Sequence, residues 1–422
     1  MSHTFQRGKK RHLYSCENLP CLTGKSLAHP AVSAVNTGSK QIPLPYYGVV
    51  SINESLGTGD LGMYAMSDSE LRKTVTVCAP ARAHSNTFCI PPFHFGQANP
   101  KAKGVFPMLN HRKAAVIGCG LVGSACAFSL IQRGLFSELV LIDANRDKAE
   151  GEAMDLSHGL PYIAAMDVYA GTYDDLSDCA LIVVTAGANQ KPGQTRLELI
   201  GQNVNILNSI IPQITARPFE GILLIVSNPV DVLTYAAFRI SGYPAHRVMG
   251  SGTVLDSARL RYLLGEHLNV DSRSIHAVIV GEHGDSELAV WSGANVSGVP
   301  LDDFCEMRGH TRHREAEQRI YEEVRDSAYE IIKRKGATYY GIAMAVARIA
   351  ECVMKDERAI LPVSVVLGGQ YGLRDLALSI PSIVGRRGVE QILEIPLADG
   401  EREALNSSAA QLREVIGELE LP

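Results

Sequence analysis

The feature that most constrains the fold is a glycine-rich turn at residues 118–123, Gly-Cys-Gly-Leu-Val-Gly, between an apolar run and an apolar helix-like segment. The run before the turn, residues 113–117 (KAAVI), is typical of a buried strand. A second such run, residues 138–142 (ELVLI), ends directly before Asp143, which lies twenty residues after the last glycine of the turn. A strand, a glycine turn, a helix and a second strand ending at an acidic residue form the complete dinucleotide-binding fingerprint.

The chemistry of a dinucleotide explains each residue of this fingerprint. Gly118 permits the tight turn, Gly120 lets the backbone approach a pyrophosphate, and Gly123 allows the helix to pack closely on the strand. The N-terminus of the helix offers unpaired N–H groups and a partial positive charge to the phosphates. Asp143 can accept hydrogen bonds from the ribose hydroxyls and would repel a 2′-phosphate. We therefore expect NAD rather than NADP as the cofactor.

Downstream segments repeat the alternation of strand and helix. They are a helix at residues 147–156 and apolar strands at residues 167–170, 180–186 and 221–227. This pattern is typical of an α/β fold with an open parallel sheet. We expect a Rossmann-type doubly wound sheet over residues 112–254 and an α+β substrate domain over residues 255–422, with ligands at the carboxyl ends of the strands.

Residues 1–111 have a different character, because Pro, Gly, Ser and Asn interrupt them and no periodicity is sustained. They hold eleven Lys and Arg against five Asp and Glu, so the rest of the chain is acidic, which argues against nucleic-acid binding by that part. Three interpretations are open: a disordered extension, a targeting peptide, or a segment foreign to the mature protein, which would begin at Met108. We favour the first and the third.

Apolar runs and cysteines indicate the cellular environment. No apolar run reaches the roughly 18 residues that cross a bilayer, so we expect no membrane span. The nine cysteines form no Cys-x-x-Cys pair and follow no secretory signal. These features favour free thiols in a reducing cytoplasm. No metal site is expected, because His283 and Asp285 adjoin turn glycines and the sequence shows no third ligand at metal spacing.

Further motifs follow the fingerprint. They are residues 187–196 (GANQKPGQTR), 227–231 (SNPVD), 250–259 (GSGTVLDSAR), 281–285 (GEHGD) and 335–341 (KGATYYG). With the fingerprint they resemble the bacterial L-lactate dehydrogenases of the lactate/malate dehydrogenase family, from about residue 113 to the C-terminus. The resemblance implies reversible, NADH-dependent reduction of pyruvate to L-lactate, a place in glycolytic fermentation, and a homotetramer.

The resemblance assigns the acid–base chemistry to His283 and Asp256. Imidazole has an ordinary pKa near ~6.5, which suits proton transfer at neutral pH. A carboxylate partner such as Asp256 fixes the tautomer and stabilises the imidazolium form. Arg259 is the substrate clamp, because a guanidinium fork matches a carboxylate. Asp256 and Arg259 share one helix face. The alternatives are a structural histidine and a surface ion pair.

The remaining substrate positions are also implied by the resemblance. Arg196 lies on the Gly- and Pro-containing segment after the fourth strand, which can act as a lid; the alternative is a solvated loop arginine. Closure of this lid would bring Arg196 to the carbonyl oxygen, where negative charge develops. Asn228 would donate to a substrate oxygen, and Thr338 would line the substrate pocket.

One position separates lactate from malate dehydrogenases in the family. The lid residue that faces the substrate's side group is Arg when that group is a second carboxylate, and here it is Gln190. A neutral amide leaves such a carboxylate without a counter-charge in a dry site. The sequence therefore favours pyruvate, with malate dehydrogenase as the nearest alternative. A non-catalytic structural or NAD-binding protein is the alternative of another class.

Additional positions match cofactor and effector contacts of the family. The remaining cofactor positions are Val122, Lys148, Tyr173, Gly187, Ala188, Ser209, Val226, Asn228, Ser251 and Ile342. Ile342 would form an apolar wall for the nicotinamide, or is an ordinary core residue. Arg261 and His276 match the positions that bind fructose 1,6-bisphosphate at a subunit interface. Alternatively, they are a helix-surface charge and the start of a strand.

Overall fold

The computed structural model describes residues 110–188, 195–310, 312–419 and 421. All of them fall within one compact unit, Pro100–Pro422. The expectations for residues 1–109 and for Gln190 lie outside the described residues. Strand β1 begins at Asn110, inside the segment that the sequence assigned to the extension.

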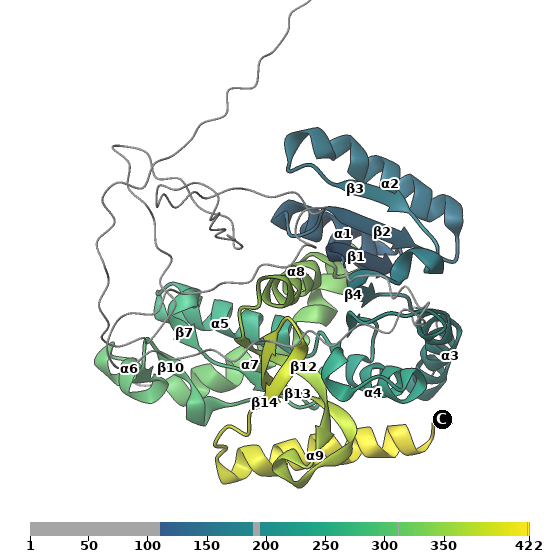
Figure 1. The fold of residues 1–422 in the computed structure, drawn as a ribbon. Coiled ribbons are helices and arrows are strands. Elements are labelled where there is room, and N and C mark those ends of the chain that lie inside the picture. Colours follow the sequence, from purple (N-terminus) through teal and green to yellow (C-terminus); the bar gives the residue numbers. More distant parts are fainter. Residues whose placement is uncertain (1–109, 189–194, 311, 420, 422) are drawn as a thin grey trace, which may run out of the picture. The chain divides into compact units, whose positions relative to one another are not determined.

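The predicted parallel sheet is present, and its six strands lie in the order β3-β2-β1-β4-β5-β6 (Figure 1). The strands are β1 (Asn110–Ile117), β2 (Glu138–Ile142), β3 (Asp167–Ala170), β4 (Cys179–Val184), β5 (Ile222–Ile225) and β6 (Val248–Gly250). Every residue of β4 and β5 is buried, as continuous apolar strands covered on both faces require. This confirms the Rossmann-type sheet.

Four helices connect these strands: α1 (Leu121–Arg133), α2 (Arg146–Gly159), α3 (Arg196–Thr215) and α4 (Val230–Ser241). Right-handed crossovers place α1 and α2 on one face of the sheet and α3 and α4 on the other. Local sequence sets the helix starts. Thr195 caps α3 and forms a capping box with Glu198, and the Asn145 side chain accepts the amide of Lys148 at the start of α2.

Three antiparallel strands from the C-terminal part extend the same sheet beyond β6. They are β12 (Ala359–Gly368), β13 (Arg374–Gly385) and β14 (Gly388–Ile392), which complete a nine-stranded sheet. The expected boundary at residue 254, between the nucleotide-binding part and the substrate domain, therefore does not separate two different sheets. Pairing with β12 covers β6, which would otherwise be an exposed edge strand.

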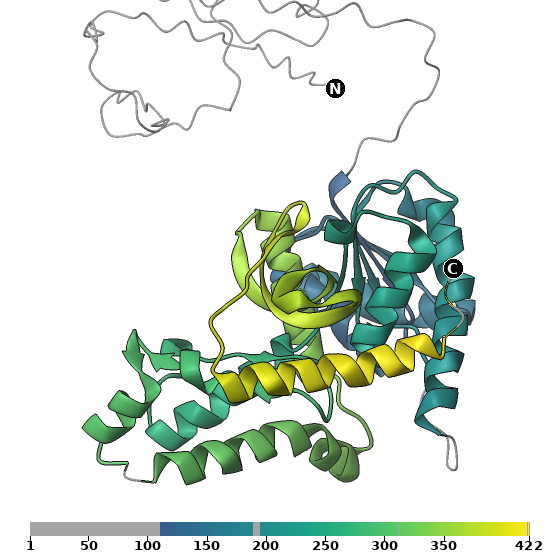
Figure 2. The same ribbon diagram turned by 90° about the horizontal axis from the view of Figure 1, so that it is seen from below.

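The rest of the C-terminal part mixes helices with short strands, which confirms the expected α+β character. Its helices are α5 (Val254–Leu268), α6 (Leu301–Met307), α7 (His313–Lys335), α8 (Tyr340–Lys355) and α9 (Asp399–Gly417). Its short strands are β7 (Ile275–His276), β8 (Ile279–Val280), β9 (Leu288–Ala289), β10 (Asn295–Val296) and β11 (Val299–Pro300). Helix α8 packs on α1, and α9 lies along β13 and α4, joining this part to the sheet (Figure 2).

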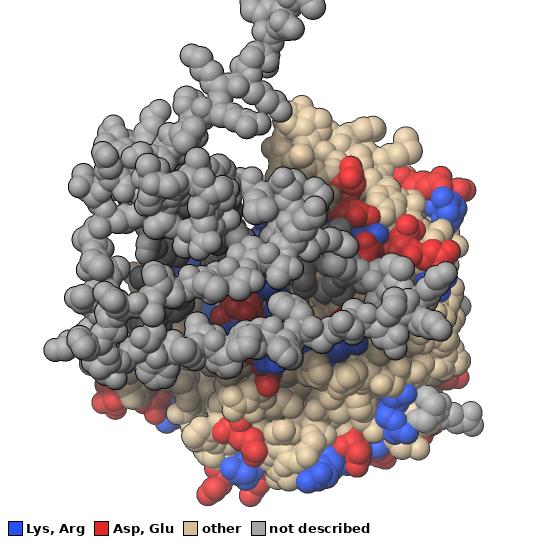
Figure 3. Space-filling model, viewed as in Figure 1, with Lys and Arg blue, Asp and Glu red and all other residues tan. Residues whose placement is uncertain are grey.

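Short 3₁₀ helices complete the description. They are η1 (Leu160–Tyr162), η2 (Tyr173–Leu176), η3 (Ala245–Arg247), η4 (Ser272–Ser274), η5 (Trp291–Gly293) and η6 (Gln370–Gly372). No helix in the described ranges is long and apolar enough to cross a membrane. On the face shown in Figure 3, basic and acidic side chains are interspersed over the part that is drawn in colour.

Candidate active site

The glycine turn lies at the carboxyl end of β1, and its geometry requires glycine at positions 118 and 123. Gly118 has φ +102°, and a Cβ there would lie 2.6 Å from the amide nitrogen of Ala186. A Cβ on Gly123 would lie 1.8 Å from the Gly118 carbonyl oxygen, so α1 could not pack against the turn. A Cβ on Gly120, the N-cap of α1, would meet nothing within 4 Å, so open space faces the N-terminus of this helix. This arrangement fits a pyrophosphate.

Asp143 follows β2 and is fixed beside the turn by two backbone amides. Its Oδ2 accepts a hydrogen bond from the Cys119 amide at 2.7 Å, and its Oδ1 accepts one from the Asn145 amide at 2.9 Å. Each carboxylate oxygen has a further lone pair for a ribose hydroxyl. The acid and the turn are therefore held in one arrangement that fits the adenosine end of NAD.

Other predicted cofactor positions gather at the same edge of the sheet, because each follows the carboxyl end of a parallel strand. They are Gly187 and Ala188 after β4, Val226 and Asn228 after β5, and Ser251 after β6. One residue that links Ala188 to Asn228 is absent from the predicted cofactor positions. Buried Asn203 of α3 accepts the amide of Ala188 at 2.7 Å and donates to the Asn228 carbonyl at 2.8 Å. A polar residue on the buried face of α3 was the available signal.

The remaining cofactor positions lie on the surrounding helices. Val122 of α1, Tyr173 at the start of η2 and Ile342 of α8 are half-buried, whereas Lys148 of α2 and Ser209 of α3 are exposed. The Ser209 hydroxyl donates to the Ile206 carbonyl of its own helix at 2.7 Å. Ile342 packs against the main hydrophobic core, which agrees with its interpretation as an ordinary core residue.

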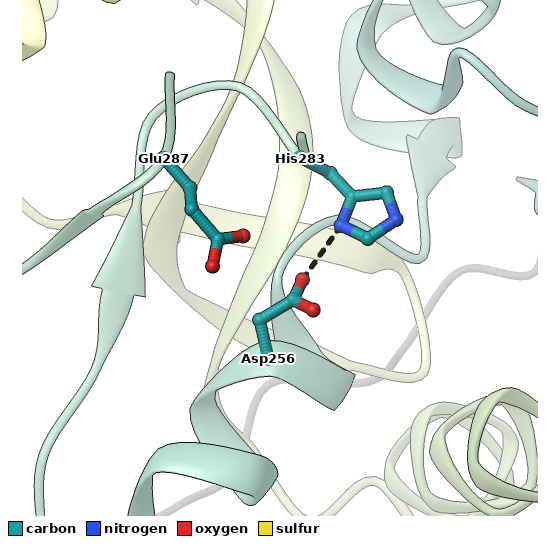
Figure 4. Close-up of side chains that lie close together, drawn as sticks. All are labelled: Asp256, His283 and Glu287. Carbon is teal, nitrogen blue, oxygen red and sulfur yellow. Dashed lines mark hydrogen bonds and ion pairs between the residues drawn. The ribbon is translucent and has the colours of Figure 1, made fainter. Parts of the chain in front are cut away.

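His283 and Asp256, 27 residues apart in the chain, form a hydrogen-bonded pair (Figure 4). The Nδ1 atom of His283, on the loop after β8, lies 2.6 Å from Oδ2 of Asp256 in the first turn of α5. The other oxygen of Asp256, Oδ1, accepts a hydrogen bond from Nη1 of Arg259 at 2.8 Å. The i,i+3 spacing does place Asp256 and Arg259 on one face. Their ion pair lies beside the histidine and is largely shielded from solvent.

Electrostatics favours the charged form of this pair. Burial lowers the pKa of His283, but the charge of Asp256 and its hydrogen bond outweigh burial and raise that pKa to about 9. Burial opposes the ionisation of Asp256, yet His283 and Arg259 hold its pKa below the ordinary value. At neutral pH His283 is therefore an imidazolium that is hydrogen-bonded to a carboxylate.

Asp231, in the first turn of α4, is a second residue that the sequence analysis did not assign. Its Oδ2 accepts the backbone amide of His283 at 2.7 Å, and its Oδ1 accepts the Ser379 hydroxyl at 3.1 Å. Burial raises the pKa of Asp231 to about 6. Asp231 lies within the family motif at residues 227–231, but the motif does not indicate that its partner is the backbone amide of His283.

Glu287 is a third buried acid of this site. Its carboxylate, that of Asp256 and the ring of His283 offer polar atoms that all lie within 4.8 Å of one another. The sequence spacing did not single out Glu287 as a neighbour of this pair, because only the fold of the loop after β8 brings its carboxylate there. Both oxygens of Asp256 are already engaged by His283 and Arg259. The arrangement is that of a hydrogen-bonded acid–base cluster.

The substrate and effector positions are described in part. Asn228 is exposed and precedes a cis peptide bond to Pro229 at the start of α4. Thr338 is half-buried between α7 and α8. Arg261 is half-buried, and its Nε donates to the Ser257 carbonyl at 3.1 Å, whereas His276 of β7 is exposed.

The two residues predicted to belong to a lid lie outside this description. Arg196 is the first residue of α3, and its side chain is not among the described atoms. Gln190 lies in the undescribed segment 189–194.

Sequence comparison identifies the family of this fold and site. A model of the lactate/malate dehydrogenase NAD binding domain matches residues 112–250, and a model of the alpha/beta C-terminal domain of the same family matches residues 253–420. The chain belongs to the lactate/malate dehydrogenase family. Its membership confirms the resemblance seen in the motifs and the expected NAD cofactor, because the first of the two family domains binds NAD.

Known proteins of this family match almost over their whole length. The L-lactate dehydrogenase of Acetivibrio thermocellus is 48% identical over 310 residues, which cover 74% of this chain and 98% of that protein. The L-lactate dehydrogenase of Thermoanaerobacterium saccharolyticum is 50% identical over 309 residues, 73% of this chain and 99% of that protein. The crystal structure of the minor L-lactate dehydrogenase from Enterococcus mundtii is similar with a TM-score of 0.72 and 43% identity, covering 74% of this chain and 99% of that one.

Proposed function

We propose that this chain is an NAD-dependent L-lactate dehydrogenase that interconverts pyruvate and L-lactate. The observation that carries the proposal is the hydrogen bond between His283 and Asp256, with Arg259 beside it, in a chain that is about half identical to L-lactate dehydrogenases. Residues 112–254 would bind the cofactor, and residues 255–422 would supply most of the catalytic groups.

The roles of the residues follow from their geometry. Since Nδ1 of His283 is bonded to Asp256, Nε2 is the atom that delivers a proton to the carbonyl oxygen of pyruvate. Arg259 binds the substrate carboxylate through its remaining N–H groups. When bound, NADH supplies the hydride that adds to the carbonyl carbon. Arg196 and Asn228 stabilise the oxygen on which negative charge develops. Thr338 lines the pocket around the substrate.

Gln190 supports pyruvate over oxaloacetate as the substrate. An amide at that position gives the second carboxylate of oxaloacetate no counter-charge. The test is kcat/KM for both acids with NADH, measured on the same preparation. A higher value for pyruvate is expected, and a clear preference for oxaloacetate would make the chain a malate dehydrogenase.

Arg261 and His276 support an effector site for fructose 1,6-bisphosphate at a subunit interface of a homotetramer. Cationic side chains suit phosphate groups, and an anion that bridges two subunits favours one quaternary state. Activation should be lost in Arg261→Gln while basal activity remains. Equal response of this variant and the natural sequence to the bisphosphate would exclude the site.

The extension and the cellular location belong to the same proposal. The family models begin at residue 112, so residues 1–111 have no assigned role in catalysis. A protein that starts at Met108 should retain the full pyruvate/NADH activity of the complete chain. Free thiols at Cys119, Cys126, Cys179, Cys305 and Cys352 support a reducing cytoplasm as the location.

A further inference from the structure

Glu287 stands out because it is a buried acid whose burial the proposed reaction does not explain. Glu287 is 3% exposed, and its carboxylate points toward Asp256 and His283 (Figure 4). Oε1 of Glu287 is buried and accepts no hydrogen bond from the described residues. An unpartnered carboxylate oxygen is costly to bury, and the cost is smaller when the group holds a proton.

The groups around Glu287 come from three directions. Helix α5 contributes Asp256 and Arg259, the loop after β8 contributes His283, and α7 contributes Arg325. The Tyr321 hydroxyl of α7 donates to the backbone carbonyl of Glu287 and not to its carboxylate. Asp231 of α4, which accepts the backbone amide of His283, adds a further negative charge.

The net charge around His283 depends on whether Glu287 is protonated. With Glu287 protonated, the three cations Arg259, Arg325 and His283 outnumber the two carboxylates of Asp256 and Asp231 by one charge, which suits an incoming carboxylate anion. When Glu287 ionises, a second carboxylate lies beside the imidazolium and opposes loss of the His283 proton. Burial, followed by the charge of Asp256, raises the pKa of Glu287 to about 8. The charge of ionised Glu287 raises the pKa of His283, and the imidazolium in turn lowers the pKa of Glu287.

We propose that Glu287 is a positioning residue whose carboxyl group sets the proton affinity of His283. The inference deepens the proposed function and rests on it, since His283 is the proton donor there. Glu287 touches neither substrate nor cofactor in this proposal. It keeps His283 protonated to higher pH and so extends the range in which pyruvate can be reduced.

The test measures His283 directly in the ligand-free protein. The His283 side chain is 25% exposed, so diethylpyrocarbonate can acylate its neutral ring, and mass spectrometry gives the rate against pH. In Glu287→Gln the midpoint of this profile should fall by at least about 0.5 pH unit, roughly threefold in proton affinity. Glu323→Gln, on the exposed face of α7, is the matched control and should leave the midpoint unchanged.

A second variant and a second measurement separate the possible outcomes. Glu287→Asp keeps a carboxyl group and should restore most of the midpoint, whether or not Glu287→Gln folds. An unchanged midpoint in a folded Glu287→Gln protein, or failure of Glu287→Asp to restore it, overturns the proposal. Loss of thermal stability alone would indicate a structural residue. The rate of His283 modification is measured without any enzymatic turnover. If the protein failed to reduce pyruvate, the proposed function would be refuted, but the effect of Glu287 on the proton affinity of His283 could still be measured.

Discussion

The backbone amide of His283 lies 2.7 Å from Oδ2 of Asp231, and this hydrogen bond joins the histidine loop to α4 across 52 residues of sequence. Helix α4 begins two residues after Asn228, the proposed donor to the substrate oxygen. The bond therefore sets the distance between a proton donor on one segment and a hydrogen-bond donor on another. Asp231 is buried, and its second oxygen is held by Ser379 of β13.

Loss of this link should impair turnover more than cofactor binding. In Asp231→Ala the backbone amide of His283 loses its acceptor, which costs about 1–3 kcal/mol and lowers kcat/KM for pyruvate by roughly tenfold or more. The dissociation constant for NADH, measured by fluorescence quenching, should change little. Asp231→Asn keeps one acceptor oxygen and serves as the control. Equal kcat/KM for the alanine variant and the natural sequence would show that the link is dispensable.

Replacement of Asp256 by Asn should shift the pH profile of pyruvate reduction toward acid. The charge and hydrogen bond of Asp256 raise the pKa of His283 to about 9, against the effect of burial. Without that charge the pKa falls to its ordinary value or below, so at pH 7.5 about a tenth of the imidazole stays protonated. We expect kcat/KM at pH 7.5 to fall by at least about tenfold. An unshifted alkaline limb would contradict the pairing.

The stability of the ligand-free protein should decrease as pH rises from 6.5 to 9. The pKa of His283 is raised from 6.5 to about 9, so the folded protein binds this proton more tightly than the unfolded chain. The resulting stabilisation is fully present below 6.5 and is lost as pH passes through 9. Glu287 acts in the same direction, because its pKa is raised from 4.5 to about 8.

Thermal unfolding curves across this range check the prediction. Between pH 6.5 and 9 the Tm of His283→Asn should fall less than the Tm of the natural sequence. Glu287→Gln should remove the part of the decline that lies between pH 4.5 and 8. Parallel curves for all three proteins would mean that other groups control the titration.

Asp143 should control the choice between the two nicotinamide cofactors. Its carboxylate is fixed by the amides of Cys119 and Asn145 and would repel the 2′-phosphate of NADPH. In Asp143→Ser we expect the ratio of kcat/KM for NADH to that for NADPH to fall by roughly tenfold or more, about 1.4 kcal/mol. Asp147→Asn, an exposed change in the first turn of α2, is the control. An unaltered ratio would remove Asp143 from cofactor recognition.

Sequence alone determined the nucleotide-binding half of the protein, because the information there is local. The run at residues 138–142 coincides with β2, and the glycine turn, α1 and Asp143 all lie within the continuous segment of residues 118–143. Each of these features depends on neighbouring residues or on one strand–helix unit. This holds for the apolar run, for the positive φ of Gly118 and for the close contact at Gly123. The family motifs likewise identified His283, Asp256 and Arg259 as a set.

Tertiary structure alone decided how that set is arranged and what surrounds it. The motifs named the pair, but packing of α5 against the loop after β8 sets the 2.6 Å between His283 and Asp256. The same packing brings in Glu287, and α4 and α3 bring in Asp231 and Asn203, whose partners lie 15 to 148 residues away. A side chain's partners depend on elements that are distant in sequence. Buried polar groups must find those partners in the folded core, and no local pattern records which ones they find.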